Sequence, residues 1–342
     1  MPTIYDIAKL AGVSATTVSK VFNDYDEVSQ KTKDKVMKIA AEIGYVPNLS
    51  ARSIRTNRSY LIGVVFSEDM GIGLEHPFFS VVLESFRKAI GEYGFDTIFI
   101  NNSVGEKKIG YLDHCKYRKV DGLFVITAHP DDLDFENLFG SKIKCVTTDI
   151  IFKDIPYVMS DNIEGVRTAI DYLFKNGHHK IAHLGGPLHT LSSRERYEAY
   201  KTVMNEKQLV VEDRQIVLSE AFDFDEAHEA TLELLGKYKR DELPTAIFAS
   251  ADIMAIGAIK AIESLGLKVP EDISVIGFDD IAFAQLSSPA LTTIRQDKVE
   301  IGRQVAYTLN QLISNKDTTW KPHRIPVTLI ERDTVKKINA AE

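Results

Sequence analysis

Two short helical patterns joined by a glycine, within residues 4–23, constrain this chain more than any other feature. The first pattern places apolar residues on one helix face: Ile4, Ile7, Ala8 and Ala11. The second does the same with Val18, Val21 and Phe22. Gly12 tolerates the left-handed conformation that ends a helix, and Ser14 is a good N-cap for the next one. We therefore predict two helices joined by a tight turn.

The outward face of the second helix is small and polar and carries one cation. Such a face can lie in the major groove of DNA with its N-terminal residues at base edges. A helical hairpin that only packs on another element is the alternative. The candidate DNA-contacting residues are Ala15, Thr16, Thr17, Ser19, Lys20 and Asn23.

Downstream, the pattern predicts a third helix over residues 30–43, ended by Gly44. Residues 47–58 are too few for a stable isolated helix, yet they hold apolar residues and three arginines. This stretch is either an inert linker or a hinge with a role on DNA.

Charge is divided unevenly along the chain. The first 58 residues carry nine Lys plus Arg against six Asp plus Glu, so the remainder has a net charge of −11 within the total of −8. A basic head on an acidic body suits a protein that touches DNA through the head alone.

Length and composition narrow the class further. The 342 residues suit two or three domains, and no apolar run approaches the length of a membrane span. The N-terminus lacks the basic and apolar regions of a secretory signal, and Cys115 and Cys145 form no metal-ligand spacing. We expect a cytoplasmic protein without a disulfide, associated with the nucleoid when bound to DNA.

From residue 61 onward, apolar strands alternate with amphipathic helices. Strands are predicted at 61–66, 96–100, 122–127, 144–148, 157–160, 180–185, 216–219, 246–249 and 273–278. Helices between them include 78–93, 163–175, 194–207, 225–238 and 252–265. This alternation indicates parallel sheets covered by helices on both faces, and about 270 residues of it favours two lobes with a cleft between them.

Specific motifs run through the whole chain. The head contains Asp6-Ile7-Ala8, Ala11-Gly12-Val13-Ser14 and Thr17-Val18-Ser19, and the body contains Val120-Asp121-Gly122, Ser160-Asp161-Asn162, Gly185-Gly186-Pro187 and the segment 270–280. With these motifs the chain resembles the lactose-repressor/galactose-repressor family of bacterial transcription regulators.

The resemblance implies a helix-turn-helix head and a two-lobed α/β body like that of periplasmic binding proteins. The implied boundaries are a head at 1–46, a hinge at 47–59 and a body at 60–335. Within the body, the N-lobe takes 60–160 and 292–323, and the C-lobe takes 161–291 and 324–335.

The family also assigns roles to residues of the head and the hinge. Ala15, Thr16 and Lys20 match positions that read operator bases. The hinge becomes helical on DNA, pairs with its copy and inserts an apolar wedge into the minor groove. The matching residues are Leu49, Ala51, Arg52, Ile54 and Arg55, with Ile54 at the wedge position where leucine is common.

A ligand in parallel α/β lobes lies beyond the carboxyl ends of strands. That rule selects Asp149, Asp161, Arg194 or Arg196, Asp252, and Asp279 or Asp280. The resemblance implies Arg196 and Asp279 as main hydroxyl binders, followed by Asp149 and Gln296. Phe79 is either a stacking partner for a ring or a core residue. The family often has Asn where this chain has Ala251, so the effector is left open as a sugar, a sugar phosphate or a purine.

The sequence gives little support for a dinucleotide-binding loop, a metal site or a catalytic motif. Gly71-Ile72-Gly73 lacks the third glycine of a dinucleotide loop. His178, His179 and His183 lack a nearby carboxylate or cysteine to complete a metal set. No nucleophile elbow, phosphate loop or zinc-protease motif occurs, so we expect neither an enzyme nor a cofactor.

We therefore expect a ligand-responsive repressor that binds a pseudo-palindromic operator in double-stranded DNA as a homodimer, with tetramers left open. A phosphorylated carrier protein acting as corepressor is the alternative within the family. A sugar-binding transport receptor and a sugar-modifying enzyme are the alternatives from other classes.

Overall fold

In the computed structural model, residues 2–22, 25–45, 58–66, 73–127, 133–315 and 322–338 are described. They fall into two units, residues 1–59 and residues 60–342, which we call the head and the body. Each unit encloses its own hydrophobic core, as the sequence predicted for an all-α head followed by an α/β body.

Three helices form the head: α1 (Ile4–Ala11), α2 (Ala15–Phe22) and α3 (Gln30–Glu42). Gly12 ends α1 with a φ of 66°, and the hydroxyl of Ser14 accepts a hydrogen bond from the Thr17 amide at 3.0 Å. The predicted turn and N-cap are thus confirmed. The buried residues of the head come from all three helices: Ile7, Ala8, Ala11, Val18, Val21, Val36 and Ala40.

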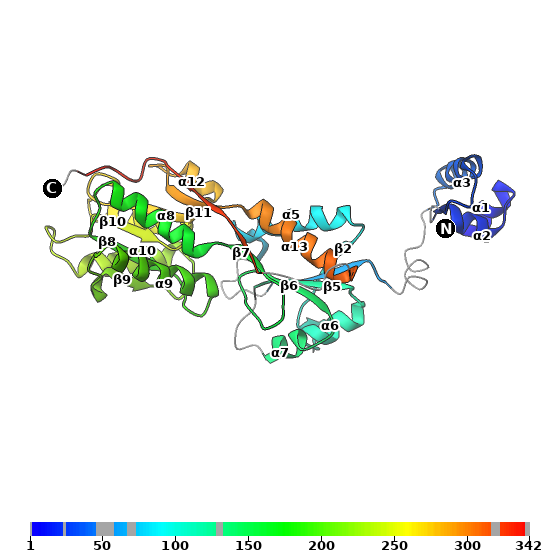
Figure 1. Cartoon of the computed structure of the whole chain (residues 1–342), viewed down its shortest axis with the longest axis horizontal. Coiled ribbons are helices and arrows are strands. Elements are labelled where there is room, and N and C mark those ends of the chain that lie inside the picture. The colour runs from blue at the N-terminus through cyan, green and yellow to red at the C-terminus, as the bar shows by residue number, and fades with distance from the viewer. Residues whose placement is uncertain are drawn as a thin grey trace. The chain divides into compact units, whose positions relative to one another are not determined.

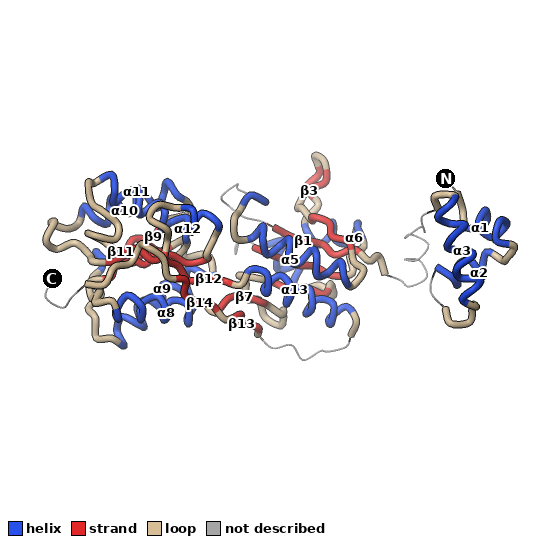
Figure 2. The backbone as a smooth tube through the Cα atoms, turned by 90° about the horizontal axis from the view of Figure 1, so that it is seen from above, coloured by secondary structure: helices blue, strands red, loops and turns tan. Residues whose placement is uncertain are grey.

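The described part of the body has two large sheets, each with helices on both faces (Figure 1). In the first, parallel strands lie in the order β2 (Asp96–Phe99), β1 (Leu61–Phe66), β5 (Gly122–Thr127), β6 (Lys144–Thr147). One face packs on α5 (Phe79–Glu92) and α13 (Lys298–Ile313), which lie side by side (Figures 1 and 2). The other face packs on α6 (Tyr111–Arg118) and α7 (Leu133–Phe139).

The second sheet has six strands. Their order is β14 (Val327–Ile330), β12 (Thr292–Gln296), β11 (Ser274–Asp279), β10 (Ala246–Ala249), β8 (Ile181–Gly185) and β9 (Ile216–Leu218). Helices α10 (Phe224–Gly236) and α11 (Asp252–Ser264) cover one face, and α8 (Asn162–Lys175) and α9 (Leu191–Glu206) cover the other. Every pairing in this sheet is parallel except β12 with β14, where the sequence had indicated parallel strands only.

Short elements complete the body. They are β3 (Ser103–Val104), β4 (Lys107–Lys108), α12 (Ala282–Leu286), and the 3₁₀ turns Gly73–Glu75 and Asp213–Gln215. Strands β7 (Val158–Ser160) and β13 (His323–Ile325) pair in parallel and contribute Val158 and Ile325 to the core of the first sheet. The first lobe therefore comprises β1 to β7, α13 and β13, and the second lobe comprises α8 to β12 and β14.

The lobe boundaries differ from those predicted. The chain returns to the first lobe between Gln296 and Lys298, because β12 pairs with β11 in the second sheet. Residues 292–296 had been assigned to the N-lobe. Conversely, β13 pairs with β7, so residues up to Ile325 belong with the first lobe, although the C-lobe had been expected to resume at 324.

The nine predicted strands agree with β1, β2 and β5 to β11 within one residue at each end. Strands β3, β4, β12, β13 and β14 were not predicted from the sequence. These strands lack the continuous apolar runs by which the others were identified, and β12 buries Thr292 and Thr293 instead.

The close approach of α13 to α5 gives a stability prediction. A Cβ at Gly302 would lie 2.4 Å from the Val82 carbonyl oxygen and 2.7 Å from the Phe86 nitrogen. We expect Gly302→Ala to lower the free energy of unfolding by about 1–3 kcal/mol because the helices must separate. Urea unfolding of the full chain measures this.

Gly91, on α5 itself, is the matched control because a Cβ there would meet no atom within 4 Å. Gly91→Ala should raise stability by about 0.5–1 kcal/mol through its greater helix propensity. Equal effects of the two substitutions would contradict close packing at Gly302.

Candidate functional sites

The outward face of α2 is available for contact with a ligand. Thr16 is exposed and Ala15, Thr17, Ser19 and Lys20 are partly exposed, whereas Val18 and Val21 are buried against the other two helices. Asn23 and the hinge residues lie outside the described residues: Leu49, Ala51, Arg52, Ile54 and Arg55. Thr16 is therefore the most exposed of these predicted residues, whereas Ala15 also packs against the core of the head.

Lys20 already has a partner within the head. Its ammonium group donates a hydrogen bond to the carboxylate of Glu27, which lies in the turn before α3. This hydrogen bond raises the pKa of Lys20 and lowers the pKa of Glu27. Both side chains are largely exposed to solvent, so this ion pair contributes little to stability and Lys20 can exchange Glu27 for another acceptor at little cost.

The body contains a cavity of about 740 Å³ lined by residues of both lobes. This volume falls within the range of small-molecule pockets in proteins, ~300–1,000 Å³. Five of the residues predicted to bind an effector line it: Phe79, Asp149, Arg196, Asp279 and Gln296. They come from α5, the segment after β6, α9, and the carboxyl ends of β11 and β12.

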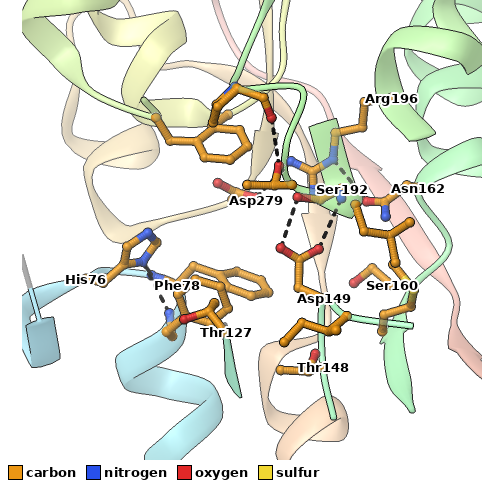
Figure 3. Close-up of a pocket in the computed structure, with 18 of the residues that line it drawn as sticks. His76, Phe78, Thr127, Thr148, Asp149, Ser160, Asn162, Ser192, Arg196 and Asp279 are labelled. Atoms are coloured by element: carbon orange, nitrogen blue, oxygen red, sulfur yellow. Dashed lines mark hydrogen bonds and ion pairs between the residues drawn. The ribbon is translucent and has the colours of Figure 1, made fainter. Parts of the chain in front are cut away.

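Asp149 reaches across the cavity from the first lobe to the second (Figure 3). Its carboxylate accepts hydrogen bonds from the amide of Ser192 at 3.1 Å and from the hydroxyl of Ser192 at 3.2 Å. Since Ser192 lies in the first turn of α9, the negative charge also meets the positive end of a helix dipole. Burial nevertheless raises the pKa of the Asp149 carboxyl to about 6, while Arg196 opposes this shift.

Arg196 is buried on α9, and its guanidinium is held on several sides. Its Nε donates to Asn162 at 2.9 Å and its Nη1 donates to the carbonyl oxygen of Ser250 at 2.6 Å. The guanidinium carbon lies 3.8 Å from the centre of the Phe278 ring, and the nearest Asp279 oxygen is 3.8 Å from Nη1. Burial lowers the pKa of Arg196, and the carboxylates of Asp279 and Asp149 raise it.

Asp279 enters the cavity from a strained turn at the end of β11. Its φ is 125° and that of Asp280 is 54°, both unusual for residues other than glycine. Ion pairs from Asp280 to Arg295 and Arg332 hold the turn, and Gln296 donates to the Asp279 carboxylate at 2.5 Å. Such strain is typical of functional positions whose surroundings fix the backbone.

Aromatic rings from the first lobe line the cavity near Phe79. The Phe79 ring centroid lies 4.7 Å from that of His76 and 5.1 Å from that of Phe78. Burial lowers the pKa of His76 to about 4, so this imidazole is neutral at physiological pH. Phe79 is half-buried, which keeps part of its ring available to a ligand.

Two predicted residues do not line the cavity. Asp161 caps α8, where its carboxylate accepts from the Glu164 amide at 3.1 Å. Asp252 is fully buried, and its carboxylate accepts from the Ile281 amide at 2.9 Å and from the Thr293 hydroxyl. Both follow the ends of strands, as the rule for ligand sites requires, but the Asp161 side chain caps a helix at a partly exposed position and the Asp252 side chain turns into the protein. The prediction of effector contacts by Asp161 and Asp252 is therefore corrected.

The structure also distinguishes Arg194 and Asp280 from Arg196 and Asp279, the residues to which they were the alternatives. Arg194 lines the cavity but is exposed, and its Nη1 donates to the carbonyl oxygens of Leu188 and His189. Asp280 is engaged with its two arginines. Asn162, Ser160 and Ser192 were not predicted as site residues, although the first two lie in a motif that carried the family resemblance.

None of the helices in the described ranges is long and apolar enough to cross a membrane. Within the same ranges, no three or more His, Cys, Asp or Glu residues are grouped as they would be to hold a metal ion. Both cysteines are buried and unpaired.

The raised pKa of Asp149 gives a pH prediction. A carboxyl whose pKa is higher in the folded state stabilises the protein below its ordinary pKa, near 4, and this contribution is lost as the pH rises through 6. Asp149→Asn removes the titration. We expect the free energy of unfolding of Asp149→Asn minus that of the unmodified protein to increase by about 2–3 kcal/mol between pH 4 and pH 7.

Urea unfolding of both proteins at several pH values measures this difference. Parallel pH profiles for Asp149→Asn and the unmodified protein would contradict burial of a charged carboxylate.

Comparisons with known proteins agree with this architecture. The family model for bacterial regulatory proteins of the lacI family matches residues 3–48, and that for a periplasmic binding protein-like domain matches residues 170–335. The HTH-type transcriptional repressor PurR of Haemophilus influenzae is 35% identical over 99% of this chain and 100% of its own length. The ribose operon repressor of Halalkalibacterium halodurans is 32% identical over 98% of each.

Among solved structures, the lac repressor dimer bound to operator and the anti-inducer ONPF is similar, with a TM-score of 0.84 and 28% identity. The match covers 98% of this chain and 99% of that one. A three-helix head, a two-lobed body and relatives aligned over nearly their full length show that the chain belongs to the lacI family of bacterial regulatory proteins.

Proposed function

We propose that this protein is a transcription repressor that binds a pseudo-palindromic operator as a homodimer and responds to a small molecule in the body cavity. One observation carries the proposal: a single chain combines an exposed, polar α2 face with a two-lobed cavity lined by Asp149, Arg196 and Asp279. The full-length similarity to named repressors, one of them solved as a dimer on its operator, supports it.

On DNA, α2 of each head would lie in the major groove of one half-site. Ala15, Thr16 and Lys20 would meet base edges, with Thr17, Ser19 and Asn23 beside them. The hinge residues Leu49, Ala51, Arg52, Ile54 and Arg55 would enter the minor groove between the half-sites, where an apolar wedge kinks the duplex. Dimerisation sets the spacing of the two heads and hence the symmetry of the operator.

The cavity gives a physical route to switching. A ligand can shift the balance between two lobe arrangements only by binding one of them more tightly. Asp149 and Ser192 make a direct contact between the lobes inside the cavity, so a ligand that inserts there or reinforces the contact changes their separation. The hinges, residues 47–59, would then carry the change to the heads.

A genomic selection tests the proposal. Immobilised full-length protein is mixed with sheared DNA from its own organism, and the retained fragments are sequenced. We expect enrichment of a two-fold symmetric site whose affinity depends on cavity ligands. Retention of all fragments in proportion to their abundance would contradict the proposed function.

Replacement of Lys20 tests whether this residue contacts a base edge of the operator. Lys20→Ala should weaken binding to the selected site by about 1–3 kcal/mol and relax the preference at one base position, because a base-edge contact is lost. Fluorescence anisotropy with the site and its single-base variants measures both effects.

Lys260→Ala is the matched control, since it removes one charge from a surface ion pair with Glu263 in the body. It should leave base preference unchanged. An equal loss of affinity for specific and random DNA in Lys20→Ala would mean that Lys20 contacts only phosphate.

A further inference from the structure

The first lobe holds the beginning of α9 at its first turn and again one turn later. At the first turn, Ser192 donates to Asp149 inside the cavity. One turn later, the carboxylate of Glu195 accepts two hydrogen bonds from the guanidinium of Arg324 on β13, at 2.9 Å and 2.6 Å. Since α9 belongs to the second lobe and Ile325 of β13 is buried in the core of the first, this ion pair joins the two lobes.

Both members of this ion pair are charged and largely shielded from water. The exposed fractions of their side chains are 13% for Glu195 and 28% for Arg324. Burial raises the pKa of Glu195, but hydrogen bonds from Arg324 and from the amide of Asn162 outweigh burial, so the pKa is lowered overall. The carboxylate in turn raises the pKa of Arg324. A two-point ion pair in a network contributes more than an isolated pair on a protein surface.

The ion pair lies beside strands about which the lobes can rotate. Strands β7 and β13 pair in parallel between the lobes (Figure 2). Since α8 follows β7 and β14 follows β13, both strands lead from the first lobe into the second. Rotation about these crossings displaces nearby groups little, but it tilts the Arg324 guanidinium relative to the Glu195 carboxylate. Two parallel hydrogen bonds resist such tilting because they require the two planar groups to stay aligned.

The ion pair is also separate from the contact that a ligand would meet. Neither Glu195 nor Arg324 is among the described residues that line the cavity, whereas Asp149 and Ser192 are. Glu195 instead lines a groove between α8 and α9. A ligand in the cavity can therefore replace or reinforce the contact between Asp149 and Ser192 without touching the ion pair one turn further along α9.

We propose that the Glu195–Arg324 ion pair restrains rotation of the second lobe about the crossing strands, so that Arg324 is a positioning residue that sets the angle between the lobes. The ion pair fixes the resting arrangement of the body, and a ligand works with or against it through Asp149 and Ser192. This inference goes beyond the proposed function, because it concerns the body alone and requires neither an operator nor a ligand.

Distances between spin labels on the two lobes test the inference in the full-length protein, without DNA or ligand. The labels are attached to Asn137→Cys on α7 and Glu229→Cys on α10, exposed positions on helices that line the cavity from opposite lobes. Both native cysteines are buried, which protects them from the label. Labelled protein is diluted into excess unlabelled protein so that distances within one chain dominate. Double electron–electron resonance then gives the distance distribution.

Glu195→Gln and Arg324→Gln each remove one charge of the ion pair. We expect each to raise the share of molecules outside the main distance peak about fivefold or more, which corresponds to ~1 kcal/mol. The two substitutions together should have no larger effect than either alone, because the same interaction is lost in all three proteins. Arg324→Lys keeps the charge but loses the two-point geometry, so its effect should be intermediate. Cooperative unfolding in urea shows that each variant is folded.

Arg167 and Glu206 supply the matched control. They form a two-point ion pair between α8 and α9, which both belong to the second lobe. Arg167→Gln should therefore leave the distance distribution unchanged. Distributions of Glu195→Gln and Arg324→Gln like that of the unmodified protein would overturn the inference, and so would equal broadening in Arg167→Gln. The proposed function fails separately, through loss of site selection in the genomic experiment.

Discussion

Burial of the Arg196 guanidinium is the constraint on which the arrangement of the ligand cavity depends. A buried cation left without partners destabilises a protein by about 3–5 kcal/mol, so its neighbours must be placed to compensate it. Asn162, the Ser250 carbonyl oxygen, the Phe278 ring and Asp279 do so here. These groups come from α8, the end of β10, and β11, and the guanidinium therefore fixes how the strand ends and helices of the second lobe meet.

The same group connects the cavity to the strands between the lobes. Asn162 accepts from Arg196 and donates to Glu195 at 2.9 Å, and Glu195 forms a two-point ion pair with Arg324 on β13. Asn162 itself directly follows Asp161, the residue after β7. An unbroken chain of hydrogen bonds thus joins a side chain that lines the cavity to β13 and its partner strand β7, the paired strands beside two of the three lobe crossings. A buried polar network whose members are hydrogen-bonded to one another rigidifies the structure around it and favours a single arrangement.

The helical head, the α/β body and nine strands could be predicted from the sequence because strong local patterns mark each of them. Gly12 and Ser14 mark the turn of the head, and apolar runs mark nine strands. The elements and side-chain directions that depend on contacts between residues distant in the chain could not be predicted from the sequence. The polar strand β12 is stable in the interior because Thr292 and Thr293 find buried partners in Thr334 and Asp252, which are distant in sequence. Likewise, a rule about strand ends selects Asp252 and Asp279 equally. In the structure, the Asp252 side chain turns into the protein. The positive φ of Asp279 directs the Asp279 side chain to the cavity.

In the proposed function, ligand binding in the body and operator binding by the head are linked. Linkage requires reciprocity: if a ligand of the body cavity changes operator affinity by some factor, saturating operator must change the affinity for that ligand by the same factor. Both quantities can be measured on one preparation, by anisotropy of labelled operator at increasing ligand concentration and by calorimetry of ligand with and without operator. We expect two equal factors of at least five, in either direction. A ligand that binds tightly and leaves operator affinity unchanged would contradict the account.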